Sequence, residues 1–589
     1  MKAAIPIRVS QSHAKDRSIS PGSSLVSEMR PTNRLRVGLV VDSLTQPRWI
    51  WNIVNDIQRS SNSEIVAVVL DPSGTESSAI IGKSLQTNRT HLLYSLYAKA
   101  DALFFPMEQD PLAPENLSPL VSLCSRIRLA TPIDKPISNR ELRQILGQNL
   151  DVALHFGART LEGKALTIAK HGVWAYHGND DSPLANGPVG FWEVIERRPL
   201  TGSALYILSS DRNGDRIIYR SSTRTHPLSM RRNQSNALWK ASAFVPRKLR
   251  DLYEVGPSAL KEEIHNVSNR SNRKKALRGF PTNFEMLCGI LGLLKRHLGS
   301  RFRRLVATEQ WFLAYHVQGL VNTANPLSDP RRIKSIMPPA DRFWADPFVV
   351  RKKGGYYVFF EECLFARRRG FLSVLEIDDS GNAGSPTKVL ERDYHLSYPF
   401  VFHWNDQYFL VPESAANKTV ELYRAVEFPY KWEFDRVLLR DVNAVDATLH
   451  CFDGRWWMFV NIALPGTSSC DELHIYYADT PLGPWLPHRR NPIKSDAGNA
   501  RSAGRIFTRD GQFFRPAQDC STRYGGSIIV NRMVRLDLEH YEEIEVSRIL
   551  PDWEPNLVAT HTFNAVDRLT VLDAKRLRSR WRRTAKAFC

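Results

Sequence analysis

The spacing of apolar residues changes once along the chain, and this change divides the sequence into two parts with different expected folds. In the first part, short apolar runs at 35–41 and 65–70 flank a stretch with apolar residues at helical spacing. A strand, a helix and a strand in close succession predict a βαβ unit and a parallel sheet. A further strand at 152–156 and a helix at 161–170 continue the pattern, so we predict one α/β domain over 35–245.

From residue 305 onward, short aromatic-rich strands recur at intervals of 52, 48, 57 and 58 residues. In the first four units an aromatic run begins ten residues after the anchor of the unit, beyond a turn rich in Gly, Asp and Asn. The five anchors are Asp346, Tyr398, Asp446, Ala503 and His561. Units of this size, built from short strands, are typical of propeller blades. We therefore predict an all-β five-bladed propeller over 305–573, closed by a strand at 311–317 that joins the last blade.

The net positive charge lies outside these two domains. The chain has a net charge of +19, and the two termini and the region between the domains account for all of it, because the rest of the chain is close to neutral. We assign basic tails to 1–34 and 574–589 and a basic linker with helices to 246–304. No nucleic-acid-binding module accompanies the basic segments, and aromatic residues are not interleaved with them, so we exclude a nucleic-acid partner.

The basic linker also contains apolar residues at helical spacing. Phe284, Leu287 and Leu291 belong to this stripe, and a basic cluster follows within 295–304. An apolar stripe with a basic end suits an anionic membrane surface, whereas the same stripe could dock on a neighbouring domain. A peripheral membrane contact through 267–304 and a solvated linker are the two alternatives.

Several absences bear on the compartment. The seven cysteines include no CxxC pair, which argues against a disulfide scaffold and against a zinc ribbon. The N-terminus lacks the apolar core of a secretory signal, and the apolar stretch at 288–294 is far shorter than the roughly 20 residues that span a bilayer. We expect a cytoplasmic protein, with any membrane contact at the cytoplasmic face.

The candidate chemistry of the second domain lies at the propeller axis, because the innermost strand of each blade begins there. Glycosidic cleavage needs one carboxylate as base or nucleophile and one carboxylic acid of raised pKa. The predicted catalytic residues are Asp346, Asp446 and Glu413, and the predicted substrate-binding residues are Tyr398, Arg501, Arg505, His561 and Trp344. A structural role in capping turns is the alternative for the aspartates. We predict no metal site.

The second domain resembles the propeller at the N-terminus of plant glucosamine inositolphosphorylceramide transferases. The resemblance is carried by FWADPFV at 343–349, YHLSYPFVF at 394–402, VDATLHCFDGRWWMFVN at 445–461 and THTFN at 560–564. The expected fold is also similar to that of five-bladed glycoside hydrolases that act on furanosides. That similarity implies that Asp346 is the base and that Asp446 tunes a pKa, but it does not place the acidic glutamate.

Residues 151–219 resemble the formyltransferase domain of methionyl-tRNA and sugar formyltransferases, which has a Rossmann-type fold. His177 fits the catalytic histidine of that family, and Asp180 lies nearby as a substrate-binding candidate. The family uses 10-formyltetrahydrofolate, with Asn and His at the oxyanion and His and Asp at the attacking amine. Here Ala175 replaces the Asn and Asn213 replaces the Asp. We therefore predict that this domain does not perform efficient formyl transfer.

Two functions follow from these observations. The first is a carbohydrate-active enzyme of surface glycan or glycolipid synthesis, whose propeller acts on a sugar or nucleotide-sugar substrate by transfer or hydrolysis. The second is a non-catalytic glycan-binding or scaffold protein built from two degenerate enzyme folds. Carboxyl groups separated by about 5–9.5 Å would favour the first.

Overall fold

The first apolar segments fold as predicted. In the computed structural model, β1 (Leu35–Val41), α1 (Arg48–Arg59) and β3 (Ser63–Leu70) form a βαβ unit, and the two strands pair in parallel. Five apolar positions of α1, from Trp49 to Ile57, follow helical spacing and are buried in the core, and Trp51 is half-buried. The predicted unit is confirmed.

The structure describes residues 33–579, except 74–90, 177–187, 189, 211–213, 259, 261–278, 318–332 and 353. Three residues singled out in the first domain, His177, Asp180 and Asn213, lie outside the described residues.

The first domain is built around a seven-stranded mixed sheet in the order β5-β3-β1-β6-β7-β8-β9. Its first five strands are parallel and its last two are antiparallel. The remaining strands are β5 (Ser125–Arg128), β6 (Val152–His155), β7 (Val173–Ala175), β8 (Leu200–Ile207) and β9 (Arg216–Arg224), and β2 (Thr45–Pro47) pairs separately with β4 (Pro114–Asn116). The helices are α3 (Leu92–Phe104), α4 (Asn139–Leu146), α5 (Phe191–Glu196), α6 (Met230–Ala241) and α7 (Phe244–Val255). The predicted α/β class is correct.

The helix predicted at 161–170 is wrong. Only a short 3-10 turn forms there, at Gly163–Thr167, with Gly163 at a φ of 54°. The end of the segment instead runs beside the start of β6, where the backbone N–H of Lys170 donates to the carbonyl of Leu150. Pairing with the chain just before β6 thus overrides the local helical pattern.

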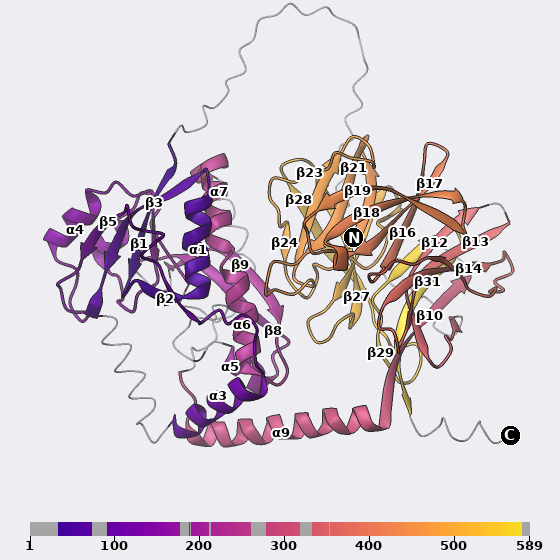
Figure 1. Ribbon diagram of the computed structural model, residues 1–589, viewed down its shortest axis with the longest axis horizontal. Helices are drawn as coiled ribbons and strands as arrows, with labels where there is room; N and C mark the ends of the chain where they lie inside the picture. Colours follow the sequence, from indigo (N-terminus) through magenta and orange to yellow (C-terminus); the bar gives the residue numbers. More distant parts are fainter. Residues whose placement is uncertain are drawn as a thin grey trace, which may run out of the picture.

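A long helix, α9 (Asn283–Val306), leads directly into the second domain (Figure 1). A capping box starts it: the Thr282 hydroxyl accepts from the N–H of Glu285, and the Glu285 carboxylate accepts from the N–H of Thr282. Helix α7 runs through residue 245, where we placed the domain boundary, and buries Leu249 and Leu252 in the first core. We propose that the first domain includes α7. No helix of the described residues is long and apolar enough to cross a membrane.

The second domain consists of five antiparallel sheets. Four of them follow one another along the chain: β12 (Arg342–Lys352), β13 (Gly355–Leu364), β14 (Gly370–Ile377) and β15 (Thr387–Leu390); β16 (Ser397–Trp404), β17 (Gln407–Ser414), β18 (Thr419–Glu427) and β19 (Lys431–Arg440); β20 (Ala444–Phe452), β21 (Arg455–Ile462), β22 (Glu472–Ala478), β23 (Leu486–Pro487) and β24 (Lys494–Ser495); β25 (Phe507–Arg509), β26 (Gln512–Asp519), β27 (Ser527–Leu536) and β28 (Tyr541–Ile549). We call these sheets blades one to four.

The fifth blade closes the ring. It joins β29 (Leu557–Ala559), β30 (Phe563–Val566) and β31 (Leu569–Ser579) to β10 (Ala307–Val317) and β11 (Lys334–Ile336). Strand β10 pairs with β31 along its whole length. The five blades and the closing strand are therefore confirmed. Closure of this kind satisfies the edges that an open sheet would expose.

The two domains contact each other through buried polar groups. Lys240 of α6 lies 3.3 Å from Asp471, and both side chains are 1% exposed. Arg247 of α7 donates two hydrogen bonds of 2.8 Å to the Glu472 carboxylate. Ser222 of β9 adds a bond of 2.7 Å to Asp496. Each of these bonds joins the first domain to blade three or to the segment that follows it.

Candidate active site at the propeller axis

The innermost strands of blades one to three share a backbone irregularity at their anchor residues. The pairing register shifts at each anchor, as expected for a β-bulge. Asp346, Tyr398 and Asp446 have φ values of 53°, 45° and 55°, in the left-handed region that residues other than glycine rarely occupy. Blade four has a positive φ at Gly504, one residue after the predicted anchor Ala503.

Asp346 is held by groups from two other blades, the second and the fifth. Its Oδ1 accepts a hydrogen bond of 2.8 Å from the Thr562 hydroxyl, and its Oδ2 accepts one of 3.3 Å from the backbone N–H of Tyr398. The side chain is 7% exposed. Burial raises the pKa of Asp346 to about 6, against the lowering effect of His561. The carboxyl group is thus ionised at neutral pH but takes up a proton in mildly acidic solution.

His561 lies between two carboxylates. Its Nδ1 is 2.6 Å from Asp573 Oδ2, and its Nε2 is 3.4 Å from Asp346 Oδ1. Burial alone would lower the pKa of His561, but the two carboxylates outweigh burial and raise it. The ring also stacks on Trp311, with the ring centroids 4.1 Å apart. This arrangement favours an imidazolium that holds Asp346 in place.

The same three side chains, Asp346, His561 and Asp573, offer ligand atoms within 4.8 Å of one another and are all buried. Their oxygens already accept hydrogen bonds: Asp573 Oδ1 accepts from the backbone N–H groups of His561 and Thr562. The predicted absence of a metal site stays a prediction.

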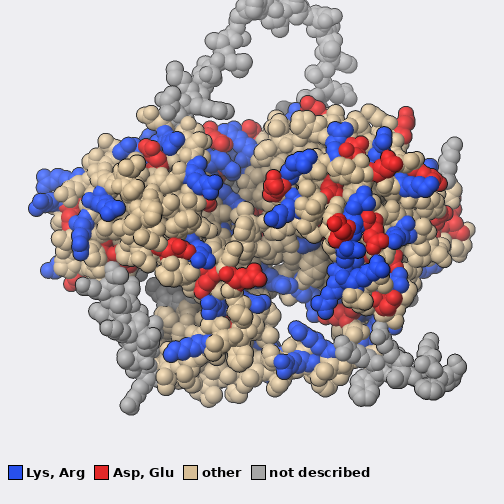
Figure 2. Space-filling view, viewed as in Figure 1, with Lys and Arg blue, Asp and Glu red and all other residues tan. Residues whose placement is uncertain are grey.

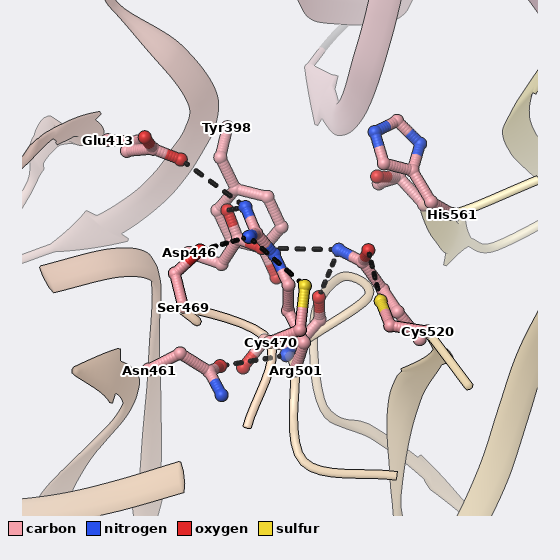
Figure 3. Close-up of polar contacts among 12 residues, drawn as sticks. Tyr398, Glu413, Asp446, Asn461, Ser469, Cys470, Arg501, Cys520 and His561 are labelled. Carbon is pink, nitrogen blue, oxygen red and sulfur yellow. Dashed lines mark hydrogen bonds and ion pairs between the residues drawn. The ribbon is translucent and has the colours of Figure 1, made fainter. Parts of the chain in front are cut away.

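A second cluster surrounds the guanidinium group of Arg501 (Figure 3). Arg501 Nε donates to Asp446 Oδ2 at 2.7 Å, and Nη2 lies 3.8 Å from Glu413 Oε2. Arg501 Nη1 donates to the Ser469 hydroxyl at 2.9 Å, and Gln518 Nε2 donates to Asp446 Oδ2 at 3.2 Å. The structure thus brings Asp446, Glu413 and Arg501 together from blades two, three and four.

The environment of Glu413 favours a protonated carboxyl group. Burial raises the pKa of Glu413 to about 8, and the negative charge of Asp446 adds to the shift, while Arg501 opposes it. Asp346 also contributes to the raised pKa of Glu413, and Asp446 contributes to that of Asp346. The two clusters therefore interact electrostatically. The Glu413 side chain is 15% exposed, compared with 3% for Asp446.

Three predicted substrate-binding residues contact other side chains and backbone groups of the propeller. Tyr398 is fully buried, and its hydroxyl bonds to Thr448 Oγ1 at 2.8 Å and accepts from the N–H of Gly504 at 2.8 Å. Arg505 lies over the ring of Phe400, with its guanidinium carbon 4.8 Å from the ring centroid. Trp344 is 4% exposed and packs against Phe360. The three side chains are therefore part of the packed interior of the propeller.

Sequence reasoning missed several residues of the two clusters. Asp573, Thr562, Gln518 and Ser469 all contact a predicted site residue. Asp573 carried a usable signal, because it is the carboxylate of strand β31 and directly follows the buried Val571 and Leu572. Ser469 carried none, because it lies in a loop outside the repeat.

The comparisons with known proteins concern this second domain. Residues 304–582 match the family described as glucosamine inositolphosphorylceramide transferase 1, N-terminal. The protein of that name from rice (Oryza sativa subsp. japonica) is 36% identical over 209 residues, which are 35% of this chain and 28% of the rice protein. The Arabidopsis thaliana protein is also 36% identical over 209 residues, with 27% of its length covered.

The propeller is similar to the N-terminal part of these transferases, as the sequence motifs predicted. The chain spans less than a third of the length of the curated relatives it matches.

Two solved structures illustrate more distant likeness. Zg3597, a family 117 glycoside hydrolase from Zobellia galactanivorans, is 11% identical and aligns over 46% of this chain and 91% of its own, with a TM-score of 0.30. A GH43_1 enzyme from Xanthomonas citri, solved with xylotriose, is 14% identical and aligns over 39% and 81%, with a TM-score of 0.28. Likeness at this level carries no information on activity.

Proposed function

We propose that this protein is a carbohydrate-active enzyme and that its propeller axis cleaves or transfers a glycosidic bond of a sugar conjugate. The observation that carries the proposal is the meeting of Asp346, Asp446, Glu413 and Arg501 from four separate blades. Their electrostatic states differ, since the pKa of Glu413 is raised to about 8 and that of Asp346 to about 6. At neutral pH one carboxyl group is therefore an acid and another is a base.

These states suit the two roles that glycosidic chemistry needs. In this proposal Glu413 donates its proton to the leaving oxygen. Asp346 takes a proton from water or from an acceptor hydroxyl, and His561 orients Asp346. Asp446, which pairs with Arg501, contributes to the raised pKa of Glu413.

The substrate class rests on the relatives. Their name contains glucosamine and inositolphosphorylceramide, and the match lies in their N-terminal part. We propose that the propeller of this chain acts on a sugar conjugate of the glycolipid or surface-glycan class, and a nucleotide sugar is the proposed donor if the reaction is a transfer.

The decisive experiment compares Glu413→Gln and Asp346→Asn with the wild-type protein on a panel of aryl glycosides, glycolipids and nucleotide sugars. Loss of a general acid or base is expected to lower turnover by about 10²- to 10⁴-fold. Glu433→Gln, which alters an exposed glutamate on β19 of blade two, is the matched control and should keep full activity. Full turnover in both site variants would contradict the proposal.

A non-catalytic glycan-binding or scaffold function is the second candidate. It is favoured by the burial of Asp346 and Asp446, whose oxygens all have partners within the protein. This candidate predicts that a glycan binds without turnover. Calorimetric binding that survives Glu413→Gln, together with no product from any substrate of the panel, would support it over the enzyme.

For the first domain we propose binding of an amino sugar or nucleotide sugar rather than formyl transfer. Ala175 of β7 is 1% exposed and stands where the resembling family has its Asn. A buried methyl group offers no donor to a formyl oxygen, so this position does not fit 10-formyltetrahydrofolate chemistry. Steady turnover of 10-formyltetrahydrofolate with any amino sugar nucleotide would refute the proposal. The cytoplasmic location stays a prediction.

A further inference from the structure

Helix α9 exposes a continuous apolar stripe along its whole length. The stripe consists of side chains that are between 50% and 74% exposed, namely Phe284, Leu287, Leu291, Leu294, Leu298, Phe302 and Leu305. Their spacing of three or four residues places them on one face of a helix that turns about 100° per residue. Exposed apolar side chains occur singly on most proteins, but an unbroken row of this length marks an interaction surface.

The opposite face of α9 holds the helix on the first domain. Met286, Gly289 and Leu293 are buried there, and a Cβ at Gly289 would lie only 3.0 Å from Ile195 Cδ1. Arg296 donates from Nη1 to the carbonyls of Val194 and Pro227. One face of α9 thus docks on the neighbouring domain, and the opposite face, which carries the apolar stripe, is exposed.

Basic side chains border the exposed stripe. Lys295 and Arg301 follow Leu294 and precede Phe302 in the sequence, and helical spacing puts them at the two edges of the stripe. Arg303 and Arg304 are also exposed at the C-terminal end of α9, but helical spacing puts them on the side away from the stripe. The acid of α9, Glu285, is bound in the capping box at the other end.

We infer that the α9 stripe is a docking surface for an anionic lipid bilayer and that the helix lies in the plane of the membrane interface. Long basic side chains at the edges of an apolar face can extend to the headgroups while the apolar residues enter the acyl boundary. The positive charge complements anionic lipid, with roughly 1 kcal/mol per basic residue near such a surface. This inference does not depend on the proposed chemistry of the propeller.

The neighbourhood of α9 supports the same occupant. Leu103 and Phe104, at the end of α3, are 81% and 79% exposed, and α3 packs against α9 through the cluster that contains Met286. Figure 1 shows both helices along the lower edge of the molecule, and Figure 2 shows mainly uncharged atoms there, with separate basic groups. A second copy of α9 is a poorer partner, because two such helices side by side would bring together mostly like charges.

The test is flotation of the full chain with lipid vesicles. We expect binding to phosphatidylcholine vesicles that contain about 30% phosphatidylglycerol, and little binding to pure phosphatidylcholine. The double variant Leu291→Ser, Leu298→Ser should bind at least about tenfold more weakly. Lys295→Glu with Arg301→Glu should lose the preference for anionic vesicles. Leu123→Ser with Leu550→Ser, which removes two exposed leucines elsewhere, is the matched control and should bind like the wild type.

Circular dichroism establishes that each variant is folded before its binding is compared. Equal binding of the stripe variant and the wild type would overturn the inference, as would absence of binding to anionic vesicles. Light scattering that shows a dimer abolished by the stripe variant, without lipid binding, would assign the surface to a second copy instead.

Discussion

Three side chains at the propeller axis, those of Asp346, Tyr398 and Asp446, sit on a backbone conformation that disfavours them. For a residue with a Cβ, left-handed backbone costs about 1–2 kcal/mol. Their contacts offset this cost: Thr562 and a backbone N–H hold Asp346, and Arg501 holds Asp446. Strain kept in place by surrounding contacts is typical of functional sites.

The conformational role of Asp346 can be separated from its charge. Asp346→Asn should fold normally, because Asn tolerates left-handed backbone and keeps an oxygen for the Thr562 hydroxyl. Asp346→Ala should lower the free energy of unfolding by about 1–2 kcal/mol more than the Asn variant does. Urea denaturation measures the difference. Equal stability of the two variants would mean that the backbone conformation is not held by the side chain.

The pKa values of the two carboxyl groups set the pH dependence of turnover. Activity requires ionised Asp346 and protonated Glu413, whose pKa values are raised to about 6 and about 8. The value of kcat/KM should therefore fall below about pH 6 and above about pH 8. Glu413→Gln should remove the alkaline limb from whatever activity remains. A flat profile from pH 5 to pH 9 would contradict the assignment.

Stability should also depend on pH through Glu413. Its folded-state pKa is about 8, against an ordinary value of 4.5, so the folded protein binds more protons than the unfolded chain between these values. The contribution of Glu413 to the free energy of unfolding is therefore lost as pH rises through this window. Glu413→Gln should flatten the decline measured by denaturation at pH 5, 7 and 9, whereas Glu433→Gln should leave it unchanged.

At the scale of single elements, most of the propeller strands could be predicted because they recur in a repeat. Short aromatic-rich strands and regular turns give the same signal in the first four units, and the fifth anchor follows at a similar interval, so five blades could be predicted from spacing alone. The prediction of a helix at 161–170 was wrong, because the end of this segment pairs with the chain just before β6, and this pairing outweighs the local helix propensity. The site could be predicted only in part: the aspartates repeat with the blades, but their left-handed backbone and the partner Asp573 depend on contacts between distant segments.

Gly504 shows why blade four departs from the other three at this position. A Cβ there would lie 2.1 Å from the carbonyl oxygen of Phe563 on β30, and its φ is 129°. Gly504→Ala should therefore destabilise the propeller by about 3 kcal/mol or more, since backbone must move. Gly511→Ala is the control: its φ is also positive, at 70°, but nothing lies within 4 Å of the added Cβ. It should cost about 1 kcal/mol. Comparable losses in thermal denaturation would contradict the steric explanation.

At the scale of the whole molecule, one short segment connects the candidate active site to the first domain. Ser469 and Cys470 contact Arg501, and the next residue, Asp471, pairs with Lys240 of α6. Glu472, one residue further, pairs with Arg247 of α7. The first domain therefore holds the loop that holds Arg501. Contacts made by the first domain therefore help to fix the position of Arg501 at the propeller axis.

Removing one partner of the buried Lys240–Asp471 pair tests whether the first domain influences the propeller axis. Lys240→Met leaves Asp471 buried beside an apolar side chain, which should lower the free energy of unfolding by about 3–5 kcal/mol. Because burial raises the pKa of Asp471, the loss should be smaller at pH 5, where protonation relieves the charge, than at pH 8. Turnover at the propeller should fall as well, although Lys240 does not contact Arg501.

A matched control separates this effect from ordinary loss of a surface charge. Lys431 and Glu427 form a pair of similar length, 2.8 Å, but are 72% and 59% exposed, so Lys431→Met should change stability by less than about 1 kcal/mol. Adding Asp471→Asn to Lys240→Met removes the unpaired charge and should restore most of the lost stability. Calorimetry should then show the first variant unfolding in two steps and the double variant returning toward the wild-type profile. If Lys240→Met unfolds like the wild type and keeps full turnover, the two domains act independently and the segment 469–472 does not couple them.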